Sequence, residues 1–388
     1  MTVPTDIAER IRRKLSEASA DPTAQTVAAL LREESELLGD TAVLDLVDEL
    51  RRDTVGAGPL DELLALPDVT DVLVNGPNEV YVDGSRGLVL TSVRFADDES
   101  VRRLAQRLAT QGGRRLDDAR PFVDVRLPDG TRLHAALSPI ARPGTLISLR
   151  VPARTAFSLG QLVECGTLSG EAALLMRALV HSRAAFLVTG GTGSGKTTLL
   201  AALLGLVSER ERMVIVEDAT ELRPEHPHVV GLEGRSTNSE GAGAIDLRDL
   251  VRQALRMRPD RLIVGEVRGA EVVDLLAALN TGHEGGCGTL HANSAADVPA
   301  RIEALGTSAG LPRPAVHSQL ASAIRIIVHV RRGRDQVRRL EEIAMLRRDD
   351  SGLVRAVSAI GFDELTRASH GEGFAELEQV IGPFASIS

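Results

Sequence analysis

Gly190-Gly191-Thr192-Gly193-Ser194-Gly195-Lys196-Thr197 matches the phosphate-loop pattern G-x-x-x-x-G-K-[ST] at every fixed position. The apolar run at 184–189 before it predicts a buried strand, and the Leu- and Ala-rich run at 198–207 predicts a helix. A glycine-rich loop between these elements aims backbone N–H groups at phosphate oxygens, and the helix N-terminus adds partial positive charge. The stretch therefore predicts a nucleotide-binding α/β domain.

The loop contains a lysine in a chain that otherwise uses arginine. Of the 45 Lys and Arg residues, only Lys14 and Lys196 are lysines. A slim ammonium suits a crowded phosphate loop, so this usage favours ATP binding over a glycine-rich turn that matches by chance. We expect Lys196 to reach the β- and γ-phosphates and the Thr197 hydroxyl to coordinate Mg²⁺. The candidate nucleotide-binding residues are Gly190, Gly191, Thr192, Gly193, Ser194, Gly195, Lys196, Thr197 and Thr198.

Composition narrows the class of protein. The 388 residues exceed one ordinary domain, and a content of 43% hydrophobic and 26% charged residues is typical of a globular chain with sizeable cores. No apolar run approaches the roughly 18 residues that span a bilayer, and the first residues do not resemble a secretory signal. Cys165 and Cys287 provide neither a disulfide framework nor a metal cluster. We expect a cytoplasmic protein without a transmembrane segment.

The charge distribution argues against a surface devoted to nucleic acid. The net charge is −9 and the pI is about 5.6, so no stable nucleic-acid binding is expected. One basic cluster stands out late in the chain, with carboxylates among and just after its members. We interpret it as a solvated, exposed segment. Its members are Arg331, Arg332, Arg334, Arg338 and Arg339.

Breaks in the sequence pattern divide the chain into three parts. Residues 1–54 are charged and helix-prone, which predicts a helical N-terminal extension. Residues 55–153 contain short apolar runs separated by turn residues and an amphipathic stretch at 98–111, which predicts a small α/β domain with one longer helix. Residues 154–388 then form the nucleotide-binding domain.

A predicted hairpin in the 55–153 domain carries two arginines. Apolar and polar residues alternate on both sides of 128–130, which predicts a three-residue loop with Gly130 in a left-handed conformation. This register sets Arg126 directly opposite Arg132. Like charges opposite each other are unfavourable, so the pair could hold an anion; two solvated arginines splayed apart are an equally good interpretation.

Two buried strands of the nucleotide-binding domain end in carboxylates. Residues 212–218 are apolar and then acidic, and Glu221 follows. Residues 261–266 end in Gly265-Glu266, which has the form of a Walker B strand with glycine where aspartate is commoner. Carboxylates at the C-terminal edge of such strands, next to a phosphate loop, handle Mg²⁺ and the attacking water.

Two histidines, His283 and His291, bracket a glycine-rich stretch after the second of these strands. A lone histidine is usually structural, but a pair around flexible glycines in this position favours sensing of the γ-phosphate. Zinc binding is the alternative. The stretch has no set of cysteine or acidic ligands at metal spacing, which argues against zinc.

The order of four motifs resembles the type II/IV secretion ATPases. These motifs are the phosphate loop (190–197), an acidic box (217–222), the Walker B strand (261–266) and a histidine box (281–293). Three further stretches look specifically like the CpaF/TadA branch, which powers assembly of tight-adherence (Flp) pili: 74–77, 125–130 and 255–269.

The resemblance implies an architecture and a setting. We expect a RecA-like P-loop motor domain, preceded by a smaller PAS-like α/β domain and the helical extension. The ATPase would form a homo-oligomer, a hexamer, peripherally associated with the inner face of the cell membrane. Its substrates would be ATP and Mg²⁺, and its partners would be inner-membrane proteins of a pilus or secretion platform.

The resemblance also implies residue roles. Glu266 would polarise the attacking water, and Glu221 would assist at the metal or the water. His283 and His291 would read the γ-phosphate. The metal ligands would be Thr197, Glu221 and Glu266. The N-terminal-domain arginines that approach the phosphates would be Arg126, Arg132 and Arg150.

The sequence departs from the pattern of the family in three ways, and two alternative functions remain. The four-cysteine zinc element of general secretion ATPases is missing, Cys287 is unusual in a histidine box, and the motifs do not extend to residues 1–54. One alternative is a conjugation-type traffic ATPase. Another is a nucleotide-dependent scaffold with little turnover, which would not need a water-activating carboxylate such as Glu266.

Overall fold

The structure is a computed structural model. It describes residues 10, 11, 14, 24–33, 56–67, 69–84, 87–152, 156–235, 243–282 and 284–382. The chain divides into two compact units, Met1–Pro152 and Ala153–Ser388. Within the predicted N-terminal extension, α2 (Ala24–Glu33) is helical, and most of residues 1–54 lie outside the described residues.

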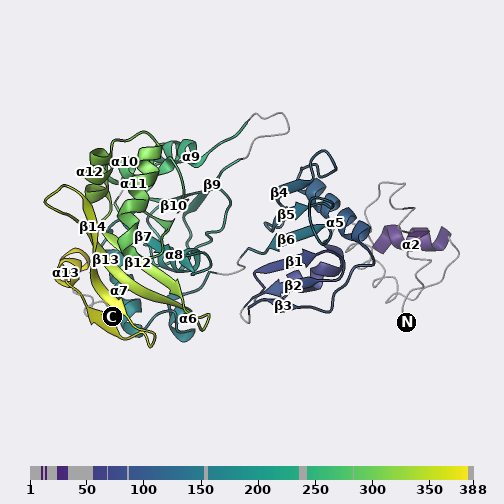
Figure 1. Ribbon diagram of the computed structural model, residues 1–388, viewed down its shortest axis with the longest axis horizontal. Coiled ribbons are helices and arrows are strands. Elements are labelled where there is room, and N and C mark those ends of the chain that lie inside the picture. Colours follow the sequence, from purple (N-terminus) through teal and green to yellow (C-terminus); the bar gives the residue numbers. More distant parts are fainter. Residues whose placement is uncertain are drawn as a thin grey trace. The chain divides into compact units, whose positions relative to one another are not determined.

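The first unit contains a six-stranded antiparallel sheet in the order β3-β2-β1-β6-β5-β4 (Figure 1). The helix α5 (Asp98–Gln111) spans the predicted residues, and Asp97 caps it by accepting a hydrogen bond from the Ser100 N–H at 2.8 Å. Its apolar face packs on the buried side chains of β1, β5 and β6. The other elements are η1 (Gly58–Leu60), α4 (Asp61–Leu64), β1 (Asp71–Asn75), β2 (Val80–Asp83), β3 (Val89–Leu90), β4 (Phe122–Arg126), β5 (Arg132–Ala136) and β6 (Leu146–Arg150).

The hairpin of β4 and β5 has the predicted register. Arg126 pairs with Arg132 across the two strands, and Gly130 in the connecting loop has a φ of 92°. The backbone N–H of Leu127 donates to the carbonyl oxygen of Thr131 at 2.8 Å and closes the three-residue loop. Alternation of apolar and polar residues therefore defined both the pairing and the turn.

The second unit is built on a nine-stranded mixed sheet in the order β15-β14-β13-β12-β7-β11-β10-β8-β9 (Figure 1). The six strands from β12 to β9 in this order are parallel to their neighbours, and β13, β14 and β15 are added antiparallel. The strands are β7 (Phe186–Gly190), β8 (Met213–Glu217), β9 (Val229–Glu233), β10 (Arg261–Val267), β11 (Cys287–His291), β12 (Ile326–Arg332), β13 (Arg338–Arg348), β14 (Val354–Phe362) and β15 (Ala368–His370).

Two hydrophobic cores lie on the two faces of this sheet. On β7, Phe186 and Val188 pack into one core and Leu187 into the other, so central strands are apolar on both sides. The first core includes α6 (Leu159–Glu164), α7 (Gly170–His181), α8 (Lys196–Leu204) and α13 (Phe374–Ile381), and the second includes α9 (Leu247–Ala254), α10 (Glu271–Leu279), α11 (Val298–Ser308) and α12 (Arg313–Ala323). This arrangement confirms the predicted α/β class.

The order of the central strands brings distant parts of the sequence together. β7, β11, β10 and β8 are neighbours and run parallel, so their carboxyl ends lie at one edge of the sheet. In open α/β sheets ligands bind outside this edge. The residues at these four strand ends are Gly190, His291, Glu266 and Glu217.

Candidate active site

The phosphate loop joins β7 to α8, as the sequence predicts. Gly195, immediately before α8, has a φ of 94°, which glycine adopts without strain. Gly190 has no room for a side chain, because an ideal Cβ there would lie 2.2 Å from the carbonyl oxygen of Val330. The helix starts at Lys196, so the N–H groups of its first turn lack intrahelical acceptors and are available to an anion.

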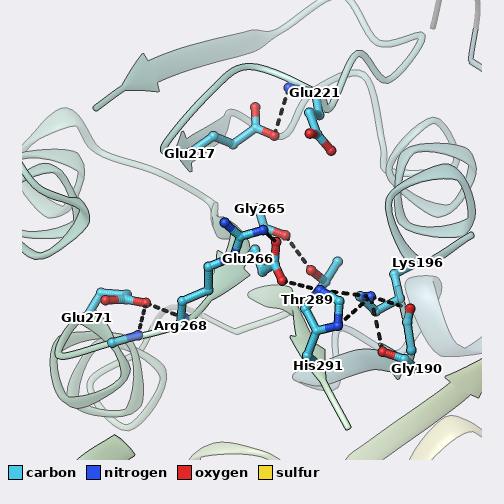
Figure 2. A network of polar contacts seen from close by, with 12 residues as sticks. Gly190, Lys196, Glu217, Glu221, Gly265, Glu266, Arg268, Glu271, Thr289 and His291 are labelled. Carbon is cyan, nitrogen blue, oxygen red and sulfur yellow. Dashed lines mark hydrogen bonds and ion pairs between the residues drawn. The ribbon is translucent and has the colours of Figure 1, made fainter. Parts of the chain in front are cut away.

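The Lys196 ammonium lies inside the loop (Figure 2). Its Nζ donates to the carbonyl oxygens of Gly190 at 3.1 Å and Gly191 at 2.9 Å, and it lies 3.5 Å from both ring nitrogens of His291. Burial lowers the pKa of Lys196, and the negative charge of Glu266 opposes this shift. A cation held by two neutral carbonyl groups can exchange them for phosphate oxygens, which are stronger acceptors.

Glu266, near the carboxyl end of β10, lies close to two basic side chains, Arg268 and His291 (Figure 2). Its Oε1 lies 2.7 Å from Nε2 of His291, and its Oε2 accepts a hydrogen bond from the Arg268 guanidinium. This bond raises the pKa of Arg268. Two partners from two different segments therefore fix the carboxylate at the edge of the sheet.

His291, at the end of β11, lies between Glu266 and Lys196. Its partial burial, and then the positive charge of Lys196, lower the pKa of His291, so the imidazole is neutral at pH 7. A neutral imidazole has one protonated and one unprotonated ring nitrogen, so it can both donate and accept a hydrogen bond. His283, the other histidine singled out from the sequence, lies outside the described residues.

Glu217 fills the space that Gly265 leaves on the neighbouring strand. An ideal Cβ at Gly265 would lie 2.4 Å from the Cγ of Glu217, because β8 and β10 run side by side. Burial raises the pKa of Glu217 to about 7. The glycine at the Walker B position therefore makes room for a carboxyl side chain from β8.

Glu217 in turn fixes the backbone of Glu221. Its Oε1 accepts hydrogen bonds from the N–H groups of Glu221 at 3.1 Å and Leu222 at 3.0 Å (Figure 2). The Glu221 side chain is exposed, and its negative charge acts on the pKa of both Lys196 and Arg268. Glu221 therefore belongs to the same electrostatic environment as the phosphate loop.

The contact between Gly265 and Glu217 yields a stability prediction. Replacing Gly265 by Ala should lower the free energy of unfolding by about 1–3 kcal/mol, the usual cost of overpacking a filled core. The matched control is Gly231→Ala on β9, where an added Cβ meets no atom within 4 Å. Urea unfolding measures both variants. Equal stability of the two would mean that Glu217 does not need the space at position 265.

Sequence reasoning missed three residues that support Glu266 and its strand. Arg268 pairs with Glu266, and an arginine two positions after a strand-end carboxylate lies on the same side of an extended chain, which is a usable signal. Glu271 accepts hydrogen bonds from the N–H groups of Arg268 at 2.6 Å and Gly269 at 2.7 Å. Thr289 donates from Oγ1 to the Gly265 carbonyl oxygen at 2.6 Å and ties β11 to β10. Neither of these two contacts has a sequence signal.

The donor atoms at this edge suit a magnesium ion. Within the part of the chain that the structure describes, no three His, Cys, Asp or Glu side chains gather closely enough to hold a metal by themselves. Mg²⁺ in nucleotide sites takes one or two protein oxygens and completes its shell with phosphates and water. The hydroxyl of Thr197, in the first turn of α8, and the carboxylates of Glu221 and Glu266 are oxygen donors of this kind.

A cavity of about 510 Å³ opens beside the loop. Gly191, Thr192 and His291 line it together with Asp297 and Arg301, from the segment where η3 (Ala295–Asp297) leads into α11. The cavity therefore adjoins the loop, the His291 ring and one further guanidinium. It provides room next to the phosphate loop for a group that approaches a bound nucleotide.

The three arginines expected from the N-terminal domain share one row of the first unit's sheet. Arg132 pairs with Arg126 on one side and with Arg150 on the other. Arg132 forms a two-bond ion pair with Asp124 at 2.7 and 2.9 Å, and Arg150 bonds to Asp71 at 3.1 Å. Carboxylates on neighbouring strands thus compensate Arg132 and Arg150, whose side chains are exposed, and ion pairs of exposed side chains contribute little stability.

The basic cluster near residue 335 is the hairpin of β12 and β13. Arg338, the first residue of β13, donates from Nε to the carbonyl oxygen of Gly193 in the phosphate loop at 3.0 Å. Arg338 is exposed, as the interpretation of a solvated segment predicts, but it also bonds to the phosphate loop, and Arg332 departs from that interpretation because it is half-buried. The contact with the loop arises because β12 lies beside β7 in the sheet, which places the hairpin next to the loop that follows β7.

The fold and the site together define an α/β nucleotide-binding protein. Its carboxylate Glu266 lies on β10, next to β11, which ends at His291. The family model of the type II/IV secretion system proteins matches residues 53–367, and the chain belongs to this family. Among the described residues, none of the helices is both long and apolar enough to cross a lipid bilayer.

Two curated relatives cover most of the chain. A putative conjugal transfer protein of Mycobacterium tuberculosis is 56% identical over 328 residues, which is 83% of this chain and 93% of the relative. The type IV secretion system protein PtlH of Bordetella pertussis is 32% identical over 314 residues, which is 74% of this chain and 92% of the relative.

Two solved structures share the fold. The pilus retraction motor PilT with bound ADP has a TM-score of 0.51 at 21% identity and covers 77% of this chain and 80% of its own. The ATPase DotB of Legionella pneumophila has a TM-score of 0.50 at 20% identity and covers 76% of this chain and 80% of its own.

Proposed function

We propose that the protein is a hexameric motor that hydrolyses ATP on the cytoplasmic side of the membrane and powers pilus assembly or protein secretion. As a member of the type II/IV secretion family the chain is an ATPase. The observation that carries the proposal is Glu266, which is fixed between His291 and Arg268 two strands away from the phosphate loop. A passive nucleotide-dependent scaffold would have no need for a carboxylate in this position.

Each polar group at the sheet edge has a proposed part in hydrolysis. The loop residues 190–198 bind the phosphates through their N–H groups, and Lys196 turns from the carbonyls of Gly190 and Gly191 to the γ-phosphate. Glu266 orients and polarises the water that attacks the γ-phosphorus, after which the bond to ADP breaks and ADP and phosphate form. His291, whose Nε2 lies 2.7 Å from Glu266, reads whether the γ-phosphate is present. His283 has the same proposed role of sensing the γ-phosphate.

The ion that would accompany ATP is Mg²⁺, which neutralises charge on the phosphate oxygens as the bond breaks. Thr197 would supply one ligand, and Glu221 and Glu266 would hold ligands or bound water. Glu217 keeps the backbone of Glu221 in place for this purpose. Removal of the ion should therefore abolish turnover while the fold remains intact.

The domain arrangement proposed for the motor follows the sequence divisions 1–54, 55–153 and 154–388. The last part is a RecA-like domain and the middle part is PAS-like. Arg126, Arg132 and Arg150 would approach the nucleotide phosphates, for which Arg132 would leave Asp124 and Arg150 would leave Asp71, at small cost because ion pairs of exposed arginines are weak. This exchange would couple the nucleotide state to movement of the first unit.

Two settings for the motor are open to experiment. The motifs at 74–77, 125–130 and 255–269 favour the CpaF/TadA branch and a tight-adherence pilus platform at the inner membrane. The M. tuberculosis relative, described as a putative conjugal transfer protein, favours a conjugation-type traffic ATPase. Deletion of the gene in the organism that carries it would remove surface pili in the first setting and DNA transfer in the second.

Phosphate release by the purified full chain tests the enzymatic part of this proposal. ATP should be hydrolysed with Mg²⁺ present, and excess EDTA should stop the reaction within the mixing time. Readdition of Mg²⁺ should restore the rate. A rate that is unaffected by EDTA, or nucleotide binding without any phosphate release, would contradict the proposal.

A further inference from the structure

The hairpin of β12 and β13 carries two cross-strand pairs of arginines. Arg331 pairs with Arg339, and Arg332 pairs with Arg338. Neighbouring residues on a strand point to opposite faces, so the two pairs lie on opposite sides of the hairpin. Each pair sets like charges directly opposite each other, which is unfavourable unless an anion compensates them.

The two pairs differ in whether carboxylates neutralise their positive charges. Arg331 donates to Glu341 at 2.7 Å, and Arg339 forms a two-bond ion pair with Asp335 at 2.6 and 3.0 Å. Among the described residues, Arg332 and Arg338 have no carboxylate partner, and the buried Nε of Arg332 has no hydrogen-bond partner. The pair formed by Arg332 and Arg338 therefore has two positive charges and no negative charge of its own.

This uncompensated pair lies against the phosphate loop. The Nε of Arg338 donates to the Gly193 carbonyl oxygen at 3.0 Å. An ideal Cβ at Gly195 would lie 3.1 Å from the Cδ of Arg338, and an ideal Cβ at Gly193 would lie 3.8 Å from a terminal nitrogen of Arg332. Gly195 thus leaves room for the Arg338 side chain, and Arg332 lies beside the loop at Gly193.

We propose that Arg332 and Arg338 bind the phosphate chain of the nucleotide from within the same compact unit as the loop. A guanidinium offers paired N–H groups to phosphate oxygens, and an anion between the two side chains removes their mutual repulsion. The inference rests on the proposed nucleotide site and extends it to the β12–β13 hairpin. The ligand class is a nucleoside di- or triphosphate, and the part recognised is the phosphate chain.

Equilibrium binding of ADP to the full-length protein tests this proposal. Arg332→Gln, which keeps the length and polarity of the side chain, should weaken ADP binding by roughly 10- to 100-fold, the range for a lost hydrogen bond to a charged group. Arg338→Gln should weaken it by a similar factor. Because the lost contact is ionic, the dissociation constants of both variants should also depend less steeply on salt concentration than that of the unaltered protein.

The matched control is Arg331→Gln on the other face of the same hairpin. Loss of an exposed pair with Glu341 should change the ADP dissociation constant by less than about twofold. Arg332→Lys keeps the positive charge and should recover part of the affinity. Circular dichroism and the melting temperature confirm that each variant is folded.

Three results would overturn the proposal. These are an ADP affinity of Arg332→Gln within about twofold of the unaltered protein, an equal loss in Arg331→Gln, and an unchanged salt dependence in the Arg332 and Arg338 variants. The Lys196→Ala variant shows whether such a result contradicts only the role of the hairpin or the nucleotide site as a whole. If that variant loses ADP binding while the hairpin variants keep it, the site is correct and the hairpin has no part in it.

Discussion

Replacing Lys196 by Ala should lower ATP turnover by about 100- to 1000-fold, the range for loss of one preorganised electrostatic group. The buried ammonium donates to two loop carbonyls and lies beside the His291 ring, so phosphate oxygens can replace neutral partners around it. Its removal deletes the charge that meets the γ-phosphate as negative charge shifts in the transition state. Phosphate release at saturating ATP is the measurement.

The control for this variant is Lys14→Ala, which removes the only other lysine of the chain. Its turnover should match that of the unaltered protein. A circular dichroism spectrum and an unfolding curve of Lys196→Ala should show an intact fold, because an alanine is well tolerated in the first turn of α8. Unchanged turnover in folded Lys196→Ala would show that the loop is not the site of hydrolysis.

Glu266→Gln should bind ATP with nearly unchanged affinity and hydrolyse it about 100- to 10,000-fold more slowly, the range for loss of a group that handles a proton in the transition state. The amide keeps the size of the side chain, and its oxygen can still lie beside His291. It cannot polarise the attacking water as a carboxylate does. The measurements are the dissociation constant of ATP and the rate of phosphate release in a single turnover.

Glu372→Gln is the matched control for this second variant. Glu372 is also an arginine-paired carboxylate, bonded to Arg347 at 2.6 Å, but its side chain is 80% exposed on another part of the unit. The Glu372→Gln variant should hydrolyse ATP at the rate of the unaltered protein. If Glu266→Gln hydrolyses ATP at the original rate, the catalytic carboxylate is a different residue, and Glu221 is the next to examine.

The phosphate loop and the hairpin of the first unit could be predicted from the sequence because their signals are local. The loop at 190–197 has fixed glycine positions, and the hairpin at Arg126 and Arg132 has strict alternation around Gly130. Each pattern is decided by the backbone conformation of a few consecutive residues. The structure confirms the strand, loop, helix and hairpin at these places.

The order of the parallel strands could not be predicted in the same way. β7 neighbours β11 and β12, which follow it by about a hundred residues or more, and no local pattern records this choice. The contact of Glu217 with Gly265 and that of Arg338 with Gly193 both depend on it. For this reason the sequence did not explain why Gly265 stands where aspartate is commoner, and it did not predict that the basic hairpin contacts the phosphate loop.

The central claim is that the chain is a ring-forming ATPase motor, and the ATPase rate against protein concentration tests it most directly. Light scattering of the same samples, with and without ATP, gives the mass of the species present. We predict that the rate per subunit rises as a species of six subunits appears. A monomer that hydrolyses ATP at the same slow rate over the whole concentration range would contradict the motor and favour a nucleotide-dependent switch.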